Sequence, residues 1–204
     1  IEGYKVSEGN AYENDGVGNK VVLTVTDAAG NTTTGIARVT IKDITAPVIT
    51  SNDDKNVDAD SGICGATVVV TATATDNCTV GTPMGVRSDA LALDAVYPVG
   101  TTTIKWNVAD ANSNDAVEVT QTIVVTDNQL PVIVSNGDKN ATTDLDVCGA
   151  TVVVSATATD NCTVGLPTGV RSDALALDAA YPVGTTTIAW NVADANSNAA
   201  VEVI

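Results

Sequence analysis

Residues 101–112 read TTTIKWNVADAN, and the same stretch returns at 185–196 as TTTIAWNVADAN. Polar and apolar residues alternate in the first half of this stretch, so an extended chain would place Ile104, Trp106 and Val108 on one face. A strand that carries an inward-facing tryptophan is typical of a β-sandwich. The sequence therefore predicts an all-β protein.

The stretch belongs to a much longer repeat. Residues 47–120 return as residues 131–204 at a constant offset of 84, and 59 of the 74 aligned residues are identical. A self-similar period of this kind indicates a tandem array. We expect residues 1–46 to be the C-terminal part of a preceding, more divergent repeat (the first repeat), because residues 20–43 resemble the closing part of the next one. We expect 47–130 to be a complete repeat (the second repeat) and 131–204 to be a repeat that lacks its last strand (the third repeat).

Short runs rich in Val, Ile and Thr, separated by Asn, Asp, Gly and Pro, predict the strands of each repeat. In the second repeat the predicted strands are Val48–Thr50, Thr67–Thr73, Val86–Leu93, Thr101–Ala109 and Val117–Thr126, with a tight turn at 97–100. Only short connections, 43–47 and 127–131, separate successive repeats, and each ends in a proline. We expect tightly coupled sandwiches that form an elongated rod.

Composition excludes several classes of partner. The chain has 25 acidic and 9 basic residues, no histidine and a net charge of −16. Nucleic acids and anionic membranes would repel such a surface. No apolar run approaches the roughly 20 residues of a membrane-spanning helix. Without histidine no nucleophile–base constellation is apparent, so we do not expect an enzyme or a cofactor.

The second and third repeats each carry two cysteines at the same spacing, Cys64 with Cys78 and Cys148 with Cys162. We predict one disulfide inside each repeat, which would require the chain between the two cysteines to fold back and would indicate an extracellular location. Buried free thiols are the alternative. Two thiols are too few for a tetrahedral zinc site.

Calcium is the candidate ligand with the most support in the sequence, since hard cations bind clustered oxygens. The candidate ligands alternate with other residues in the stretch that follows the tryptophan strand: Asp110, Asn112, Asn114, Asp194, Asn196 and Asn198. The glycine and the closing glutamate of a calcium loop are missing, and the first repeat has a simple turn sequence at 27–31. A hairpin turn is therefore the competing interpretation.

Arg87 and Arg171 are two of the few cations in their repeats. Local pairing with Asp89 and Asp173, or with Asp94 and Asp178, is the simplest interpretation, and a ligand anchor is the alternative.

The repeat resembles the HYR (hyalin repeat) module, an immunoglobulin-like sandwich of extracellular adhesion proteins. The resemblance rests on five segments: the Asp43-to-Pro47 entry with Val48-Ile49, 64–68 (CGATV), 74–78 (ATDNC), 97–103 (YPVGTTT) and 108–112 (VADAN). The acidic, nearly identical repeats also resemble in style the large gliding-motility adhesins of Bacteroidetes, which are exported by the type IX secretion system.

This resemblance implies a structural stalk or filament segment of a long secreted cell-surface adhesin. Its partners would be neighbouring repeats and an unknown surface or glycan receptor elsewhere in the parent protein. The alternatives are a multivalent glycan- or calcium-binding module and the spacer domains of an exported enzyme.

Overall fold

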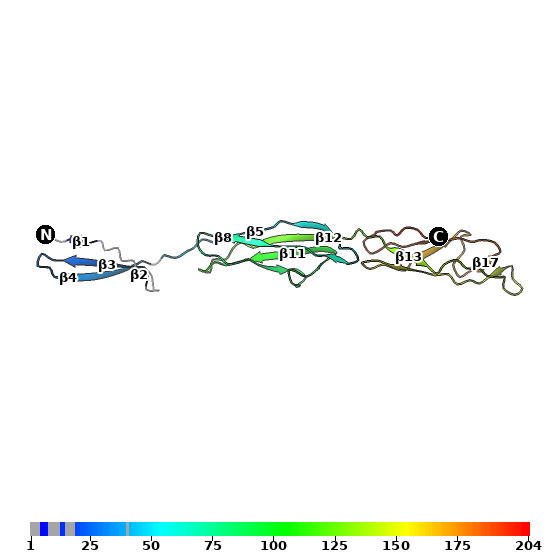
Figure 1. Ribbon diagram of the computed structural model, residues 1–204, viewed down its shortest axis with the longest axis horizontal. Helices are drawn as coiled ribbons and strands as arrows, with labels where there is room; N and C mark the ends of the chain where they lie inside the picture. The colour runs from blue at the N-terminus through cyan, green and yellow to red at the C-terminus, as the bar shows by residue number, and fades with distance from the viewer. Residues whose placement is uncertain (1–4, 8–12, 15–18, 40) are drawn as a thin grey trace.

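The computed structural model describes residues 5–7, 13–14, 19–39 and 41–204. These residues form strands, turns and loops, with the three repeats arranged end to end along one long axis (Figure 1). No described segment is a helix that could cross a membrane. The predicted all-β class and elongated rod are both confirmed.

The first repeat contributes a four-stranded antiparallel sheet. Strand β3 (Asn19–Thr26) lies at its centre and pairs along its whole length with β4 (Thr32–Val39). Strands β1 (Lys5–Ser7) and β2 (Glu13–Asn14) pair with the other edge of β3. Part of the predicted first repeat, 1–4, 8–12, 15–18 and 40, lies outside the described residues.

The second repeat is a β-sandwich of the predicted immunoglobulin-like kind. One layer pairs β5 (Val48–Ser51) with β8 (Ala72–Thr75). The other layer has the order β6-β12-β11-β9, with bounds Lys55–Asp58, Val119–Thr126, Gly100–Asn107 and Met84–Arg87. A short pair, β7 (Gly65–Ala66) with β10 (Tyr97–Pro98), closes one side.

Two predicted strands of the second repeat differ from the observed ones. The run 67–73 is mostly irregular, and its pairing begins only at Ala72 in β8. The run 86–93 is a strand only to Arg87, after which a loop turns away. Hydrogen bonds that the Arg87 side chain donates to this loop, described below, hold the loop and end the strand.

The core of the second repeat lies between the two layers. Ile104 and Ile123 are fully buried, Trp106 is 3% exposed, and Tyr97 is fully buried beside them. Gln121 is also fully buried, and its Oε1 accepts a hydrogen bond from Trp106 Nε1 at 3.0 Å. The predicted inward face of the tryptophan strand is confirmed at Ile104 and Trp106.

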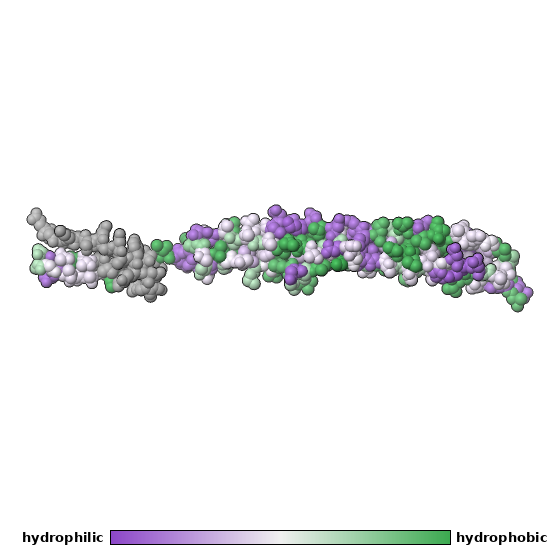
Figure 2. All heavy atoms as spheres, viewed as in Figure 1, coloured by the Kyte–Doolittle hydropathy of each residue, from purple (hydrophilic) through white to green (hydrophobic). Residues whose placement is uncertain are grey.

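The third repeat has the same arrangement over its described length, with three antiparallel pairs. These are β13 (Val132–Ser135) with β15 (Ala156–Thr159), β14 (Gly149–Ala150) with β17 (Tyr181–Pro182), and β16 (Thr168–Arg171) with β18 (Ile188–Asn191). Figure 2 shows hydrophobic residues gathered on the visible face of this repeat. Tyr181 and Ile188 are only partly buried, unlike their fully buried equivalents in the second repeat.

Candidate functional site: the junction between repeats

A disulfide joins the second and third repeats. Cys64 and Cys162 are bonded, with an S–S distance of 2.11 Å and a Cα–Cα distance of 4.7 Å. Cys78 and Cys148 are exposed thiols. The bond crosses the connection at 127–131 and fastens the end of one sandwich to the start of the next.

The predicted pairing inside each repeat is therefore wrong, for both Cys64–Cys78 and Cys148–Cys162. The bonded cysteines have a sequence separation of 98, which is the spacing within one repeat plus one full period. A sequence of near-identical repeats cannot distinguish these two pairings. The structure distinguishes them because Cys64 and Cys162 lie on loops that meet at the junction.

Asp127 is the hub of this junction and is 3% exposed. Its Oδ1 accepts hydrogen bonds from Asn161 Nδ2 at 3.2 Å and from the Gln129 amide at 3.1 Å. Its Oδ2 accepts from Asn196 Nδ2 at 2.9 Å, and its backbone carbonyl accepts from Asn198 Nδ2 at 3.1 Å. Side chains of the third repeat thus bind the first residue of the connection.

A second group of bonds ties the connection to the Cys64 loop. Gln129 Nε2 donates to the Asp60 carbonyl, and the Gly62 amide donates to Gln129 Oε1, each at 3.1 Å. Asn161 Nδ2 also donates to the Ile63 carbonyl at 3.2 Å, directly between the two repeats. The disulfide therefore lies within a hydrogen-bonded interface.

The junction between the first and second repeats shares part of this design. Asp43 Oδ1 accepts from Asn77 Nδ2 at 3.3 Å, and the Asp43 carbonyl accepts from Asn114 Nδ2 at 3.2 Å. Hydrogen bonds, first that of the Thr45 amide, hold the pKa of Asp43 below its ordinary value of 3.8. The equivalent contacts at two junctions indicate that successive repeats dock on one another in the same way.

The candidate calcium residues form turns that serve this junction. Asp110 Oδ1 accepts from the amides of Asn112 and Asn114, each at 2.8 Å, and Asp194 does the same with Asn196 and Asn198. Burial alone would raise the pKa of Asp194, but the hydrogen bonds from Asn198 and Asn196 outweigh it and lower the pKa. The hairpin interpretation fits these contacts, and calcium binding by this set stays a prediction.

A different carboxylate set has the geometry to hold a cation. Asp127, Asp160 and Asp194 each place an oxygen within 4.8 Å of the other two, and they come from the connection, from the loop before Cys162 and from the turn. The Oδ1 of the neighbouring Asn161 is buried without a hydrogen-bond partner among the described residues. Only Asp194 of this set was a candidate from the sequence.

Arg87 and Arg171 are structural residues, and local pairing with Asp89 and Asp173 is confirmed. All five N–H groups of Arg87 are used: two bind the Asp89 carboxylate and three bind the carbonyls of Ala92, Ala95 and Val96. The guanidinium also stacks 3.8 Å from the centre of the Tyr97 ring. No donor is left for a ligand, and Arg171 makes the equivalent contacts.

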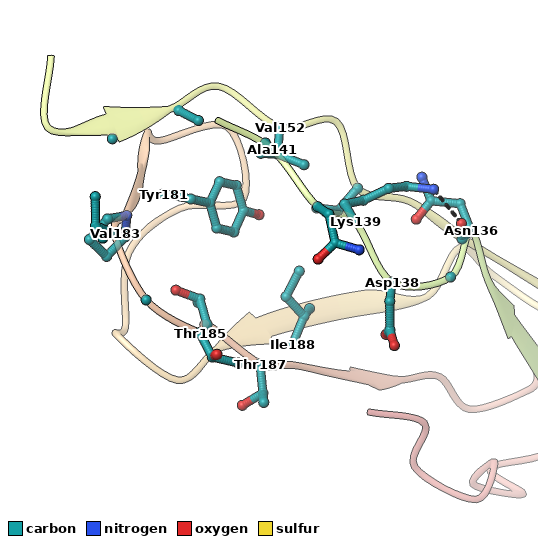
Figure 3. Close-up of a pocket in the computed structure, with 18 of the residues that line it drawn as sticks. Asn136, Asp138, Lys139, Ala141, Val152, Tyr181, Val183, Thr185, Thr187 and Ile188 are labelled. Carbon is teal, nitrogen blue, oxygen red and sulfur yellow. Dashed lines mark hydrogen bonds between the residues drawn. The ribbon is translucent and has the colours of Figure 1, made fainter. Parts of the chain in front are cut away.

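A groove of about 860 Å³ lies in the third repeat (Figure 3). Its walls include 184–188 and 139–142, which correspond to 100–104 and 55–58 of the second repeat. Those are the segments that pair with the two edges of β12. The groove is therefore the place that β12 fills in the second repeat. Its lining includes Tyr181, Ile188 and Trp190, the equivalents of core residues of the second repeat.

Comparisons with known proteins add little to this description. No family model matches the sequence, and no curated protein matches it. Among solved structures, the chain is similar to the extracellular cadherin domains 1–4 of protocadherin gamma B7, with 15% identity and a TM-score of 0.36. The match covers 90% of this chain and 56% of that one, so this chain spans little more than half its length.

Sequence reasoning missed the residues that build the junction. Asp43 and Asp127 were identified only as residues at the repeat boundaries. Asn77 and Asn161 were identified only as part of the recurring segment that ends in a cysteine. The signal that could have revealed them is their common offset of 84, because each begins a connection or precedes a cysteine in both copies.

Proposed function

We propose that this chain is a load-bearing segment of the stalk of a long secreted surface adhesin. The observation that carries the proposal is the Cys64–Cys162 disulfide, which joins successive sandwiches across a short connection. A flexible tether would gain nothing from such a bond. A rod that must keep its direction under load gains both alignment and covalent continuity.

The surroundings of the bond support the same role. Disulfides persist in oxidising compartments, which supports an extracellular location. The net charge of −16 favours a soluble rod that repels its neighbours. Residues that recur at the repeat period, such as Arg87 and Asp127, serve packing and the junctions. Adhesion during gliding and export by the type IX system belong to this proposal as the biological setting.

Small-angle X-ray scattering tests the rod. We expect the maximum dimension of the oxidised chain to match the first-repeat sheet and two sandwiches in line, and to stay constant between low and high salt. The variant Cys64→Ser/Cys162→Ser should show a broader distance distribution, whereas Cys78→Ser/Cys148→Ser should match the parent. A compact or freely hinged oxidised chain would contradict the stalk proposal.

A cation-dependent junction is the second candidate, favoured by the Asp127, Asp160 and Asp194 cluster. Calcium would offset the repulsion between three carboxylates and satisfy the buried Asn161 oxygen. We expect calcium to raise the unfolding midpoint relative to chelator, and Asp160→Asn to abolish the increase. Asp178→Asn, at an exposed position of the same repeat, is the control. Identical midpoints with calcium and chelator would remove this candidate.

A further inference from the structure

We propose that Cys148 and Cys78 each form an inter-repeat disulfide equivalent to Cys64–Cys162, with a repeat of the same kind that follows or precedes. Cys148 would bond to the equivalent of Cys162 in a following repeat, and Cys78 to the equivalent of Cys64 in a preceding one. The inference rests on the proposed stalk function and extends it to the whole array.

The period provides the first argument. Cys148 is the copy of Cys64, and Cys162 is the copy of Cys78, both at the common offset of 84. The observed bond uses the first cysteine of one repeat and the second cysteine of the next. Each complete repeat therefore presents one cysteine forward and one backward, so a single rule pairs every cysteine of an array.

The Cys148 loop already has the shape of the bonded loop. Around the bonded cysteine, the Asp60 amide donates to the Gly65 carbonyl at 2.7 Å, and in the third repeat the Asp144 amide donates to the Gly149 carbonyl at 2.8 Å. The residue two before each cysteine is left-handed in both loops, with φ of 72° and 62°. Within 141–147 only Asp144 is identical with its counterpart in 57–63. Two different loop sequences therefore hold the first cysteine in the same conformation.

Cys78 is presented like the bonded Cys162. The Cys78 amide donates to Asp76 Oδ2 at 2.9 Å, and the Cys162 amide donates to Asp160 Oδ2 at 3.0 Å. The preceding asparagine side chain lies 3.5 Å from Sγ in one case and 3.6 Å in the other. A hydrogen bond to Asp43 raises the pKa of the Cys78 thiol, which lowers the fraction of this thiol that is present as the reactive thiolate.

The bond forms by ordinary thiol–disulfide exchange with glutathione disulfide as the oxidant. One cysteine thiolate attacks the glutathione disulfide and releases one glutathione thiolate. The second cysteine thiolate then attacks the protein sulfur of the mixed disulfide and releases the other. Two protein thiols are oxidised by two electrons, one glutathione disulfide is reduced, and the two protons leave to solvent or to the glutathione thiolates.

The mechanical consequence follows from the overlap of successive bonds. The shortest covalent path enters a repeat at its second cysteine, runs back along the chain to the first, and leaves through the next disulfide. Only the stretch between the two cysteines, about 50 Å when extended, lies on the load path of each repeat, whereas a full period would extend to about 290 Å. A fully bonded array could unfold its sandwiches without lengthening appreciably.

The test uses the chain extended by a copy of residues 121–204 placed directly after Ile204, which continues the period. Serine replaces Cys64, Cys78, Cys162 and the appended copy of Cys148, so that only Cys148 and the appended copy of Cys162 remain. After refolding with glutathione disulfide at micromolar protein concentration, we expect the monomer to resist alkylation until it is reduced. Both thiols alkylating without reduction, in a chain whose circular dichroism matches the parent, would overturn the proposal.

A matched control asks whether the pairing is specific to the junction. In the original chain, Cys64→Ser/Cys78→Ser leaves Cys148 and Cys162 within one repeat, and we expect both to remain alkylatable. Cys78→Ser/Cys148→Ser leaves the observed pair and should bond. A bond inside the repeat would overturn the proposal even if the rod seen by scattering were intact. A hinged chain with correct pairing would instead contradict only the stalk function.

Discussion

At the scale of single residues, the buried Arg87 and Arg171 make the hydrogen bonds that another side chain could least easily replace. The side chain of Arg87 is fully buried, yet every N–H group has an acceptor, and its partner Asp89 is held at 2.5 Å. The planar fork of arginine can serve a carboxylate and three carbonyls at once, which the single nitrogen of lysine cannot do. The loop 88–96 depends on this geometry.

We therefore predict that Arg87→Met and Arg87→Lys both lower the unfolding midpoint of the oxidised chain, by on the order of 10 °C. The lysine variant keeps the charge but leaves carbonyls without donors, so it should recover little. Lys105→Met is the control, because that side chain is 61% exposed and pairs with Glu118 at the surface. Differential scanning calorimetry checks the prediction, and a fully stable Arg87→Lys variant would contradict it.

Acid should destabilise the chain through the same residues. Hydrogen bonds from Arg87 and Arg171 hold the pKa values of Asp89 and Asp173 below the ordinary 3.8. A carboxyl whose pKa is lower in the folded state stabilises that state above its unfolded pKa and loses the contribution as pH falls through the folded pKa.

We expect the unfolding midpoint to be flat near neutral pH and to fall as the pH drops below about 4. Asp89→Asn/Asp173→Asn should be less stable at pH 7 and should lose less between pH 5 and 3. The exposed pair Asp94→Asn/Asp178→Asn provides the control. Parallel curves for the parent and the first variant would show that these carboxyls do not set the acid limit.

At the scale of strands, β9 passes so close to the tryptophan that only glycine fits. A Cβ at Gly85 would lie 2.8 Å from Trp106 Cζ3 and 3.0 Å from Ile104 Cγ2, both in the core. We predict that Gly85→Ala costs about 1–3 kcal/mol through overpacking. Gly81→Ala, where nothing lies within 4 Å, should change stability by less than about 0.5 kcal/mol. Chemical denaturation compares the two, and equal effects would contradict this account of β9.

The groove of the third repeat leads to a second prediction at this scale. Adding Gln-Thr-Ile-Val-Val-Thr, the sequence of 121–126, after Ile204 should fill the place that β12 occupies in the second repeat. The added strand can pair with 184–188 and 139–142, and its Ile and second Val enter the core, as Ile123 and Val125 do at 0% and 2% exposure.

We expect this addition to slow hydrogen exchange at the Ile188 amide by at least roughly tenfold, because a strand ladder and a closed core replace an open edge. The matched control carries Asp at those two core positions and should give no protection. Protection by both tails would show that the groove does not select a strand.

At the scale of the whole molecule, the disulfide determines how the chain responds to force. When the chain is pulled from its ends, the bond removes the residues between Cys64 and Cys162 from the extending path, a separation of 98. We predict that reduction increases the final contour length by about 330 Å. Single-molecule pulling checks this value, with Cys78→Ser/Cys148→Ser as the control. An increase of only about 50 Å per repeat, the extended length between the two cysteines of one repeat, would instead indicate a bond within each repeat.

Much of this architecture could be predicted from sequence, because it depends on local chemistry. The alternation around Trp106 predicted a buried strand face, and the recurrence at an offset of 84 predicted a tandem rod. The end of β9 could not be predicted, because it depends on hydrogen bonds that Arg87 donates to carbonyls further along the chain, such as that of Val96. The junction hub could not be predicted either, since Asp127 acquires its partners only when two repeats meet.

The sequence by itself determined the strand pattern, the repeat period and the acidic surface, because these follow from residue order and composition. Only the tertiary structure decided which cysteines bond. Cys78 and Cys162 are equivalent in sequence, so both are formally possible partners for Cys64. Docking of one sandwich on the next brings Cys162 to a Cα distance of 4.7 Å from Cys64, and proximity in space decides which thiols can form the bond.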